Sequence, residues 1–234
     1  MCNRFLGCAC YTRNPAMRSD ALIFDLDGTL WDTSETCAAA WNRVTQRLGI
    51  VARQVTADDV RGVAGLPHPE GVRRVFDTLT ADEVAQISDL TMLEDNRALA
   101  ESGGTLFPGV SELVPRLSAR LPLFIVSNCQ AGYIEVFLKT SGLGAHFVDF
   151  ECWGNTGRNK AQNLRVVIDR NGLWSPWFVG DTEGDRAAAR DNGVRFAHAA
   201  YGFGTAADSD ARLDAFTDVA RLVDISGVAR FADG

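Results

Sequence analysis

The stretch ALIFDLDGTL, residues 21–30, places two carboxylates at the end of a four-residue apolar run. A short apolar run bounded by a polar turn predicts a buried strand of a parallel sheet, here over residues 21–24. Residues i and i+2 of an extended segment point the same way, so Asp25 and Asp27 should share one face. Ligands of open α/β sheets bind just beyond the carboxyl ends of such strands. Taken alone, an Asp-x-Asp is more often an acidic turn after a core strand than a site.

The composition is that of an ordinary globular protein. Its 234 residues suit one large domain, or a core with a smaller insert, and 46% of them are hydrophobic. The net charge of −7 argues against a nucleic-acid partner, because phosphate neutralisation needs a basic face. The sequence contains no run of about 20 apolar residues of the kind that spans a bilayer. We therefore expect neither a nucleic-acid nor a membrane partner.

The first nineteen residues have no helical or strand period, and we predict that residues 1–19 are a poorly ordered extension. They carry three of the six cysteines, without a Cys/His pair at zinc spacing. The other three cysteines are widely spaced along the chain. Unpaired thiols of this kind are typical of a reducing compartment, so we expect a cytoplasmic protein.

Residues 31–105 have a helical pattern and no convincing strand. Capping residues, apolar spacing and glycine stops predict helices over residues 34–48, 56–65, 71–79 and 80–101. A glycine pair at residues 103–104 and a Phe-Pro-Gly turn at residues 107–109 follow, and these are typical of a hinge.

The second half of the chain alternates helix and strand. Strands are predicted over residues 121–126, 147–150, 176–179 and 194–197, with helices over 110–120, 130–141, 160–171 and 182–192 and from about residue 210 onward. Such alternation predicts a parallel sheet covered by helices. The expected fold is α/β, a Rossmann-like core of residues 20–30 and 106–234 with an inserted helical domain, residues 31–105.

Polar side chains follow three of the predicted strands, and one lysine opens a helix between them. Each alone has a plain structural explanation as a turn, a helix cap or a solvated side chain. The carboxyl ends of parallel strands meet at one edge of a sheet, however, so all of them should converge. The residues expected to meet there are Asp25, Asp27, Ser127, Asn128, Lys160, Asp181 and Asp185.

This combination of side chains suits phosphoryl transfer. A cage of carboxylates binds Mg²⁺, which prefers oxygen ligands and keeps waters that phosphate can replace. A carboxylate can also attack phosphorus and form an acyl phosphate. A hydroxyl, an amide and an ammonium suit the oxygens of the transferred phosphoryl group.

The motifs resemble those of the haloacid dehalogenase (HAD) superfamily. FDLDGT at residues 24–29, then Ser127, Lys160, and Asp181 with Asp185, follow the order of the four motifs of that superfamily. The resemblance covers about residues 20–205. It implies the HAD fold, with the first strand central and flanked by the strands that carry the second and fourth motifs.

Two further stretches narrow the resemblance. SNCQAGY at residues 127–133 and ECWGNTG at residues 151–157 are similar to bacterial HAD hydrolases of the phosphoglycolate-phosphatase-like group. The helical insert occupies the place of the type 1 cap of that superfamily. A cap implies that residues 65–68, a Gly-Leu-Pro-His loop, lie over Asp25 when the cap closes.

The resemblance also implies a role for each carboxylate. Asp25 would be the nucleophile and a ligand of the Mg²⁺ cofactor. Asp27 would be the general acid and then the general base, with its backbone carbonyl on the metal. Asp181 would be a direct metal ligand, and Asp185 would support the metal or its waters.

The other site residues would bind the phosphoryl group. The resemblance assigns Ser127 and Asn128 to its oxygens. Lys160 would bind the phosphate as well and would offset the negative charge of Asp25, which makes it part of the catalytic set.

The predicted function is therefore a Mg²⁺-dependent phosphatase that acts on a small soluble phosphate monoester through a phosphoaspartate on Asp25, as a monomer or homodimer. A phosphomutase of the same superfamily, similar to β-phosphoglucomutase, would use the same machinery. A dehalogenase is disfavoured, because dehalogenases of the superfamily lack the second carboxylate, here Asp27. A non-catalytic HAD-fold module is the remaining alternative.

Overall fold

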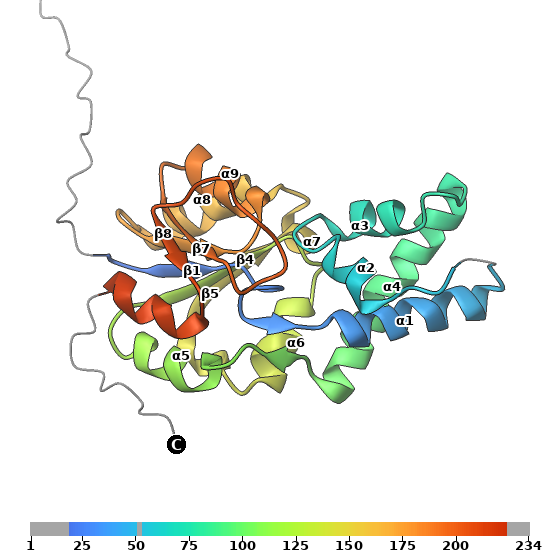
Figure 1. The fold of residues 1–234 in the computed structure, drawn as a ribbon, viewed down its shortest axis with the longest axis horizontal. Coiled ribbons are helices and arrows are strands. Elements are labelled where there is room, and N and C mark those ends of the chain that lie inside the picture. The colour runs from blue at the N-terminus through green and yellow to red at the C-terminus, as the bar shows by residue number, and fades with distance from the viewer. Residues whose placement is uncertain (1–18, 51–52, 224–234) are drawn as a thin grey trace, which may run out of the picture.

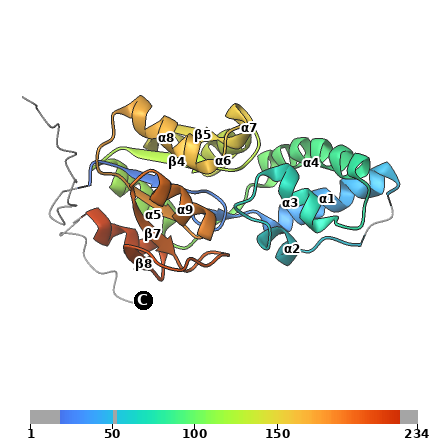
Figure 2. The same ribbon diagram turned by 90° about the horizontal axis from the view of Figure 1, so that it is seen from above.

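The computed structural model describes residues 19–50 and 53–223. The predicted extension therefore lies, except for Ser19, outside the described residues. The fold is a six-stranded, fully parallel sheet with helices on both faces and a group of helices at one end (Figures 1 and 2). In the described part of the chain, every helix is too short or too polar to cross a membrane.

The order of the three central strands that the resemblance implies is confirmed. The sheet runs β5-β4-β1-β6-β7-β8, which puts β1 at its centre between β4 and β6. The strands are β1 (Leu22–Phe24), β4 (Leu123–Ser127), β5 (Phe147–Cys152), β6 (Trp177–Gly180), β7 (Arg195–Ala199) and β8 (Ala211–Leu213). In register, Phe24 pairs with Ile125 on one side and with Val179 on the other, so the polar residues after each strand come out at one edge.

Alternate residues of the strands pack on opposite faces of the sheet, because side chains along a strand alternate in direction. Leu22 and Phe24 face the cluster covered by α5 and α6, while Ile23 faces the cluster covered by α8 and α9 (Figure 1). The helices of the core are α5 (Val110–Ser118), α6 (Tyr133–Thr140), α7 (Trp153–Thr156), α8 (Lys160–Asn171) and α9 (Glu183–Asp191), with the 3₁₀ helices η1 (Gly144–His146) and η2 (Phe216–Val223).

The inserted helices form a cap with its own hydrophobic cluster, in which Trp41, Val72 and Ile87 are buried. They are α1 (Ser34–Leu48), α2 (Ala57–Arg61), α3 (His68–Val75) and α4 (Ala81–Ser102). Seen from above, the cap stands beside the carboxyl-terminal edge of the sheet (Figure 2).

Two predictions about strands are wrong. The segment 31–105 does contain strands at its ends: β2 (Trp31–Asp32) pairs antiparallel with β3 (Thr105–Leu106) and ties together the two crossings between core and cap. The tail after residue 210 begins with the strand β8, and only then becomes the 3₁₀ helix η2. Unlike β1, which lies in an apolar run, these segments of two or three residues show neither such a run nor a period of two.

Candidate active site

Lys160 joins two carboxylates at the centre of the site. Its ammonium donates to Asp25 Oδ1 at 2.7 Å and to Asp185 Oδ1 at 2.6 Å, and all three side chains are buried. Lys160 is the first residue of α8, which begins at a capping box formed by Asn159 and Gln162. Burial by itself would lower the pKa of Lys160, but the charges of Asp185 and Asp25 raise it above its usual range. The lysine therefore stays protonated.

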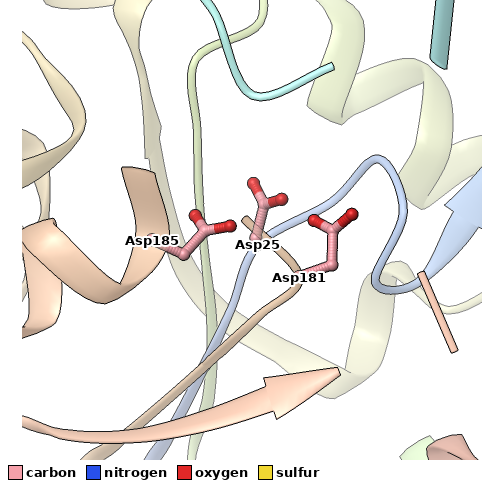
Figure 3. Close-up of side chains that lie close together, drawn as sticks. All are labelled: Asp25, Asp181 and Asp185. Atoms are coloured by element: carbon pink, nitrogen blue, oxygen red, sulfur yellow. The ribbon is translucent and has the colours of Figure 1, made fainter. Parts of the chain in front are cut away.

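A third carboxylate, from Asp181, completes the cluster. Asp25 after β1, Asp181 after β6 and Asp185 on α9 offer oxygens that all lie within 4.8 Å of one another (Figure 3). Burial and the charge of Asp185 raise the pKa of Asp181 to about 7. Burial and Asp185 likewise raise the pKa of Asp25 well above its usual value. One ammonium thus does not fully compensate three carboxylates.

The residues present fit a divalent cation. Asp181 Oδ2 accepts from the backbone N–H groups of Phe203 (2.8 Å) and Gly204 (3.0 Å), which fixes the carboxylate in place. Asp181 Oδ1 is buried and has no hydrogen-bond partner among the described residues. An unpartnered buried carboxylate oxygen beside two others is a ligand set that suits Mg²⁺.

The loop that holds Asp181 contains glycines that leave it room. A Cβ on Gly28, whose φ is +81°, would lie 2.4 Å from Asp181 Oδ2. A Cβ on Gly202 would lie 2.2 Å from the backbone oxygen of Gly28. From sequence, residues 202–205 give only a faint dinucleotide-loop pattern without a βαβ unit after it. Their place beside Asp181 is a feature that sequence reasoning missed.

Asp27 lies outside this cluster, in a separate hydrogen-bonded setting. Its Oδ1 accepts from the Tyr133 hydroxyl at 2.9 Å and from Thr33 Oγ1 at 3.1 Å. Burial raises the pKa of Asp27 to about 6, against these two hydrogen bonds, which lower it. A carboxyl group with a pKa near neutrality can both give and take a proton. Sequence reasoning did not single out Thr33 or Tyr133 as site residues.

Ser127 and Asn128 lie in the same cavity as Asp25 and Asp27, at the end of β4. Ser127 Oγ accepts from the backbone N–H of Cys129 at 3.3 Å. Asn128 Nδ2 donates to the backbone oxygen of Gly65, in the cap, at 2.7 Å. The second predicted motif therefore touches the cap as well as the site.

The cavity measures about 80 Å³ and is lined by core and cap together. The loop predicted to lie over Asp25 contributes Gly65, Leu66 and His68 to its lining. His68 Nε2 is 3.0 Å from Thr91 Oγ1 inside the cap, and burial lowers the pKa of His68 to about 4. It is therefore a packed, uncharged side chain at neutral pH.

A family model described as haloacid dehalogenase-like hydrolase matches residues 22–199 of the chain. The chain belongs to that family. The match runs from the central strand to the fifth strand of the sheet and includes the cap. All seven residues described above as the predicted site lie inside it.

Relatives of this HAD hydrolase include phosphoglycolate phosphatases. It is 30% identical over 197 residues to the one from Synechococcus elongatus, which covers 78% of this chain and 84% of the relative. It is 26% identical over 228 residues to the one from Vibrio parahaemolyticus, covering 88% and 96%. Together with the family match, these relatives show that the HAD hydrolase is a phosphatase.

A solved structure supports the fold. A haloacid dehalogenase-like family hydrolase from Streptococcus pneumoniae superposes with a TM-score of 0.75 at 24% identity. The alignment covers 87% of this HAD hydrolase and 97% of the other chain. The predicted HAD fold, an α/β core with a helical cap, is therefore confirmed.

Proposed function

We propose that this protein is a Mg²⁺-dependent phosphatase that hydrolyses a small phosphate monoester through a phosphoaspartyl intermediate on Asp25. The observation that carries the proposal is the pairing of two different carboxyl groups in one cavity. Asp25 is tied to Lys160 in the carboxylate cluster, whereas Asp27 lies apart from it with a pKa of about 6. This division matches a nucleophile beside a general acid.

In the first step, a carboxylate oxygen of Asp25 attacks phosphorus and the ester P–O bond breaks. The protonated carboxyl of Asp27 gives its proton to the leaving oxygen, which departs as an alcohol. In the second step, Asp27, now ionised, takes a proton from a water molecule that attacks the phosphoaspartate. The bond between Asp25 and phosphorus breaks, inorganic phosphate leaves, and both carboxyl groups return to their starting states.

The other residues of the site neutralise negative charge and position the phosphoryl group. Lys160 compensates Asp25 and the phosphoryl oxygens, and the Ser127 hydroxyl and Asn128 amide supply donors at the same edge of the sheet. Mg²⁺ would be held by Asp25, Asp181 and Asp185 and the backbone carbonyl of Asp27, and it would neutralise the charge of the phosphate ester.

The cap supports a small substrate. Its loop bonds to the core through Asn128 and Gly65, and the cavity left between them is about 80 Å³. A closed cavity excludes bulk water from the reacting phosphoryl group until the alcohol has left.

The oligomeric state, monomer or homodimer, and the cytoplasmic location of the protein stay predictions.

A phosphate-release screen tests the proposal. Purified protein is given a panel of small phosphate monoesters, with Mg²⁺ and after chelation. We expect inorganic phosphate and the free alcohol in equal amounts, activity lost on chelation and restored by Mg²⁺. Interconversion of phosphate esters without net phosphate release would contradict hydrolysis and indicate the phosphomutase alternative.

The nucleophile is tested by Asp25→Asn. An amide oxygen attacks phosphorus poorly, so we expect phosphate release to fall by roughly 10⁴-fold or more. The far-UV spectrum should stay unchanged, which shows that the fold is intact. Asp89→Asn, the same change at an exposed position of α4, is the matched control and should keep wild-type turnover. Phosphate release by purified Asp25→Asn at a rate close to wild type would overturn the assignment.

A further inference from the structure

The cap presents a buried wall to the cavity, opposite the phosphoryl site. This cap wall consists of Cys37 and Trp41 from α1, His68 from α3 and Asp95 from α4. Asp25 and Asp27 line the same cavity from the core. The alcohol part of a substrate whose phosphorus is at Asp25 can therefore reach the cap wall.

Asp95 is the polar group of this wall that lacks a full set of partners. Its side chain is 3% exposed, and Oδ2 accepts from Trp41 Nε1 at 3.0 Å. Oδ1 is buried and makes no hydrogen bond within residues 19–50 and 53–223. A buried polar atom left unpaired destabilises the fold. An atom of this kind, on a residue that lines a cavity able to receive a ligand, is a candidate to bind that ligand.

A protonated Asp95 carboxyl group can both donate and accept a hydrogen bond. Burial raises the pKa of Asp95 to about 8, although the Trp41 indole and the Cys37 thiol pull it down. At neutral pH its carboxyl group is mostly protonated. Because Oδ2 already accepts from Trp41, the free Oδ1 side can both donate and accept, as a hydroxyl group also can.

The cavity has no positive charge to receive an anion on the alcohol part. None of the described residues that line it is Lys or Arg, and burial keeps His68 uncharged at neutral pH. Arg61, on the neighbouring helix α2, pairs with Asp32 and Asp58, each at 2.9 Å, and does not line the cavity. A carboxylate on the substrate would therefore be buried without an opposite charge, which is unfavourable.

We propose that Asp95 binds a hydroxyl group on the alcohol part of the substrate, so that the enzyme acts on phosphate esters of small neutral polyols. This inference rests on the proposed phosphatase function. The preferred substrate would then differ from phosphoglycolate, for which the relatives are named, because the alcohol part of phosphoglycolate carries a carboxylate.

A matched set of two-carbon esters tests the inference. The four substrates differ only at the far carbon: 2-hydroxyethyl phosphate, ethyl phosphate, 2-phosphoglycolate and phosphoethanolamine. We expect kcat/KM for 2-hydroxyethyl phosphate to exceed that for each of the others by about tenfold or more. A site that hydrogen-bonds a substrate hydroxyl discriminates strongly against analogues that lack it.

Variants at residue 95 connect the preference to its cause. In Asp95→Leu, the kcat/KM ratio of 2-hydroxyethyl phosphate to ethyl phosphate should fall to about one. Asp95→Asn keeps an acceptor for Trp41 and a donor for the substrate, so the ratio should stay within about threefold of wild type. The ratio is taken on one preparation, so partial misfolding of a variant does not affect it. Asp89→Asn, on the exposed face of the same helix, should leave the ratio unchanged.

Each other outcome has a defined meaning. Equal or faster use of 2-phosphoglycolate, or an unchanged ratio in Asp95→Leu, would overturn the inference and leave the phosphatase proposal standing. Preference for phosphoethanolamine would overturn it in favour of an ion pair at Asp95. Failure to hydrolyse any of the wider panel with Mg²⁺ would overturn the phosphatase function itself, and the inference with it.

Discussion

Tyr133 controls the carboxyl group to which we assign proton transfer. Its hydroxyl donates to Asp27 Oδ1 at 2.9 Å, and this bond favours the ionised form of Asp27. Tyr133→Phe removes the bond and should raise the pKa of Asp27 above about 6. Because the proposed first step needs protonated Asp27, kcat/KM for an alkyl phosphate falls as pH rises through that pKa. We expect this limb of the pH–rate profile to move up by roughly one unit in Tyr133→Phe.

The leaving group provides the control for this prediction. The p-nitrophenolate of p-nitrophenyl phosphate leaves without a proton, so its kcat/KM should show a weaker fall over the same pH range in both proteins. A limb that stays in place, or moves to lower pH, in Tyr133→Phe would show that Asp27 is not the titrating acid.

At the scale of the element, α8 positions the Lys160 side chain in the site. Asn159 caps this helix by accepting from the backbone N–H of Gln162 at 2.9 Å, and Lys160 is the first helical residue. Asn159→Ala should lower the free energy of unfolding by about 1 kcal/mol. Because the first turn then frays, we also expect kcat to fall by roughly three- to tenfold.

The cap supplies a matched control for the helix. Thr80 forms the same type of capping box at the start of α4, far along the helix from Asp95. Thr80→Ala should cost a similar free energy in denaturant unfolding while leaving kcat close to wild type. Equal kcat losses in the two variants would show that stability, and not the position of Lys160, explains the effect.

The longer elements were predictable from sequence, and the shortest were not. The helix at residues 160–171 has a capping residue, an apolar stripe and a glycine stop, and it was predicted to the residue. The pair formed by β2 and β3 joins two-residue segments over seventy positions apart, so neither carries a periodic signal of its own. The helix predicted over residues 110–120 forms as α5 (Val110–Ser118), with Pro115 inside it.

At the scale of the whole molecule, we expect metal binding at the carboxylate cluster to stabilise the fold. Asp25, Asp181 and Asp185 come together only in the folded chain, so a cation that they bind stabilises the native state alone. At a Mg²⁺ concentration of about 100 times Kd the gain is about 2.7 kcal/mol. For a chain of this size we expect the Tm to rise by roughly 5–10 °C, measured by thermal unfolding with and without Mg²⁺.

Asp181→Asn should stabilise the metal-free protein at high pH and reduce the stabilisation that Mg²⁺ gives. The folded-state pKa of Asp181, about 7, lies above its unfolded value, so this carboxyl contributes stability below pH 4 that is lost as pH rises through 7. At pH 8 without metal the variant should therefore unfold at a higher temperature than wild type, and at pH 4 the difference should vanish. With one charge removed, most of the Mg²⁺-induced rise should disappear. A full Mg²⁺ shift in the variant would rule out Asp181 as a ligand.

The sequence by itself determined the parallel sheet and the set of polar residues at its carboxyl edge, and the resemblance to the HAD superfamily added the order of the three central strands. It could do so because buried strands, helix caps and the FDLDGT motif are local patterns, and because parallel strands bring their ends to one edge. Only the tertiary structure decided that Thr33 and Tyr133 hold Asp27 and that residues 203–204 hold Asp181. It also decided that Asp95 lines the cavity with an Oδ1 that has no hydrogen-bond partner among the described residues. These depend on contacts between segments far apart in the chain, which no local period records, and on burial, which is the main cause of the raised pKa values of Asp27, Asp95 and Asp181.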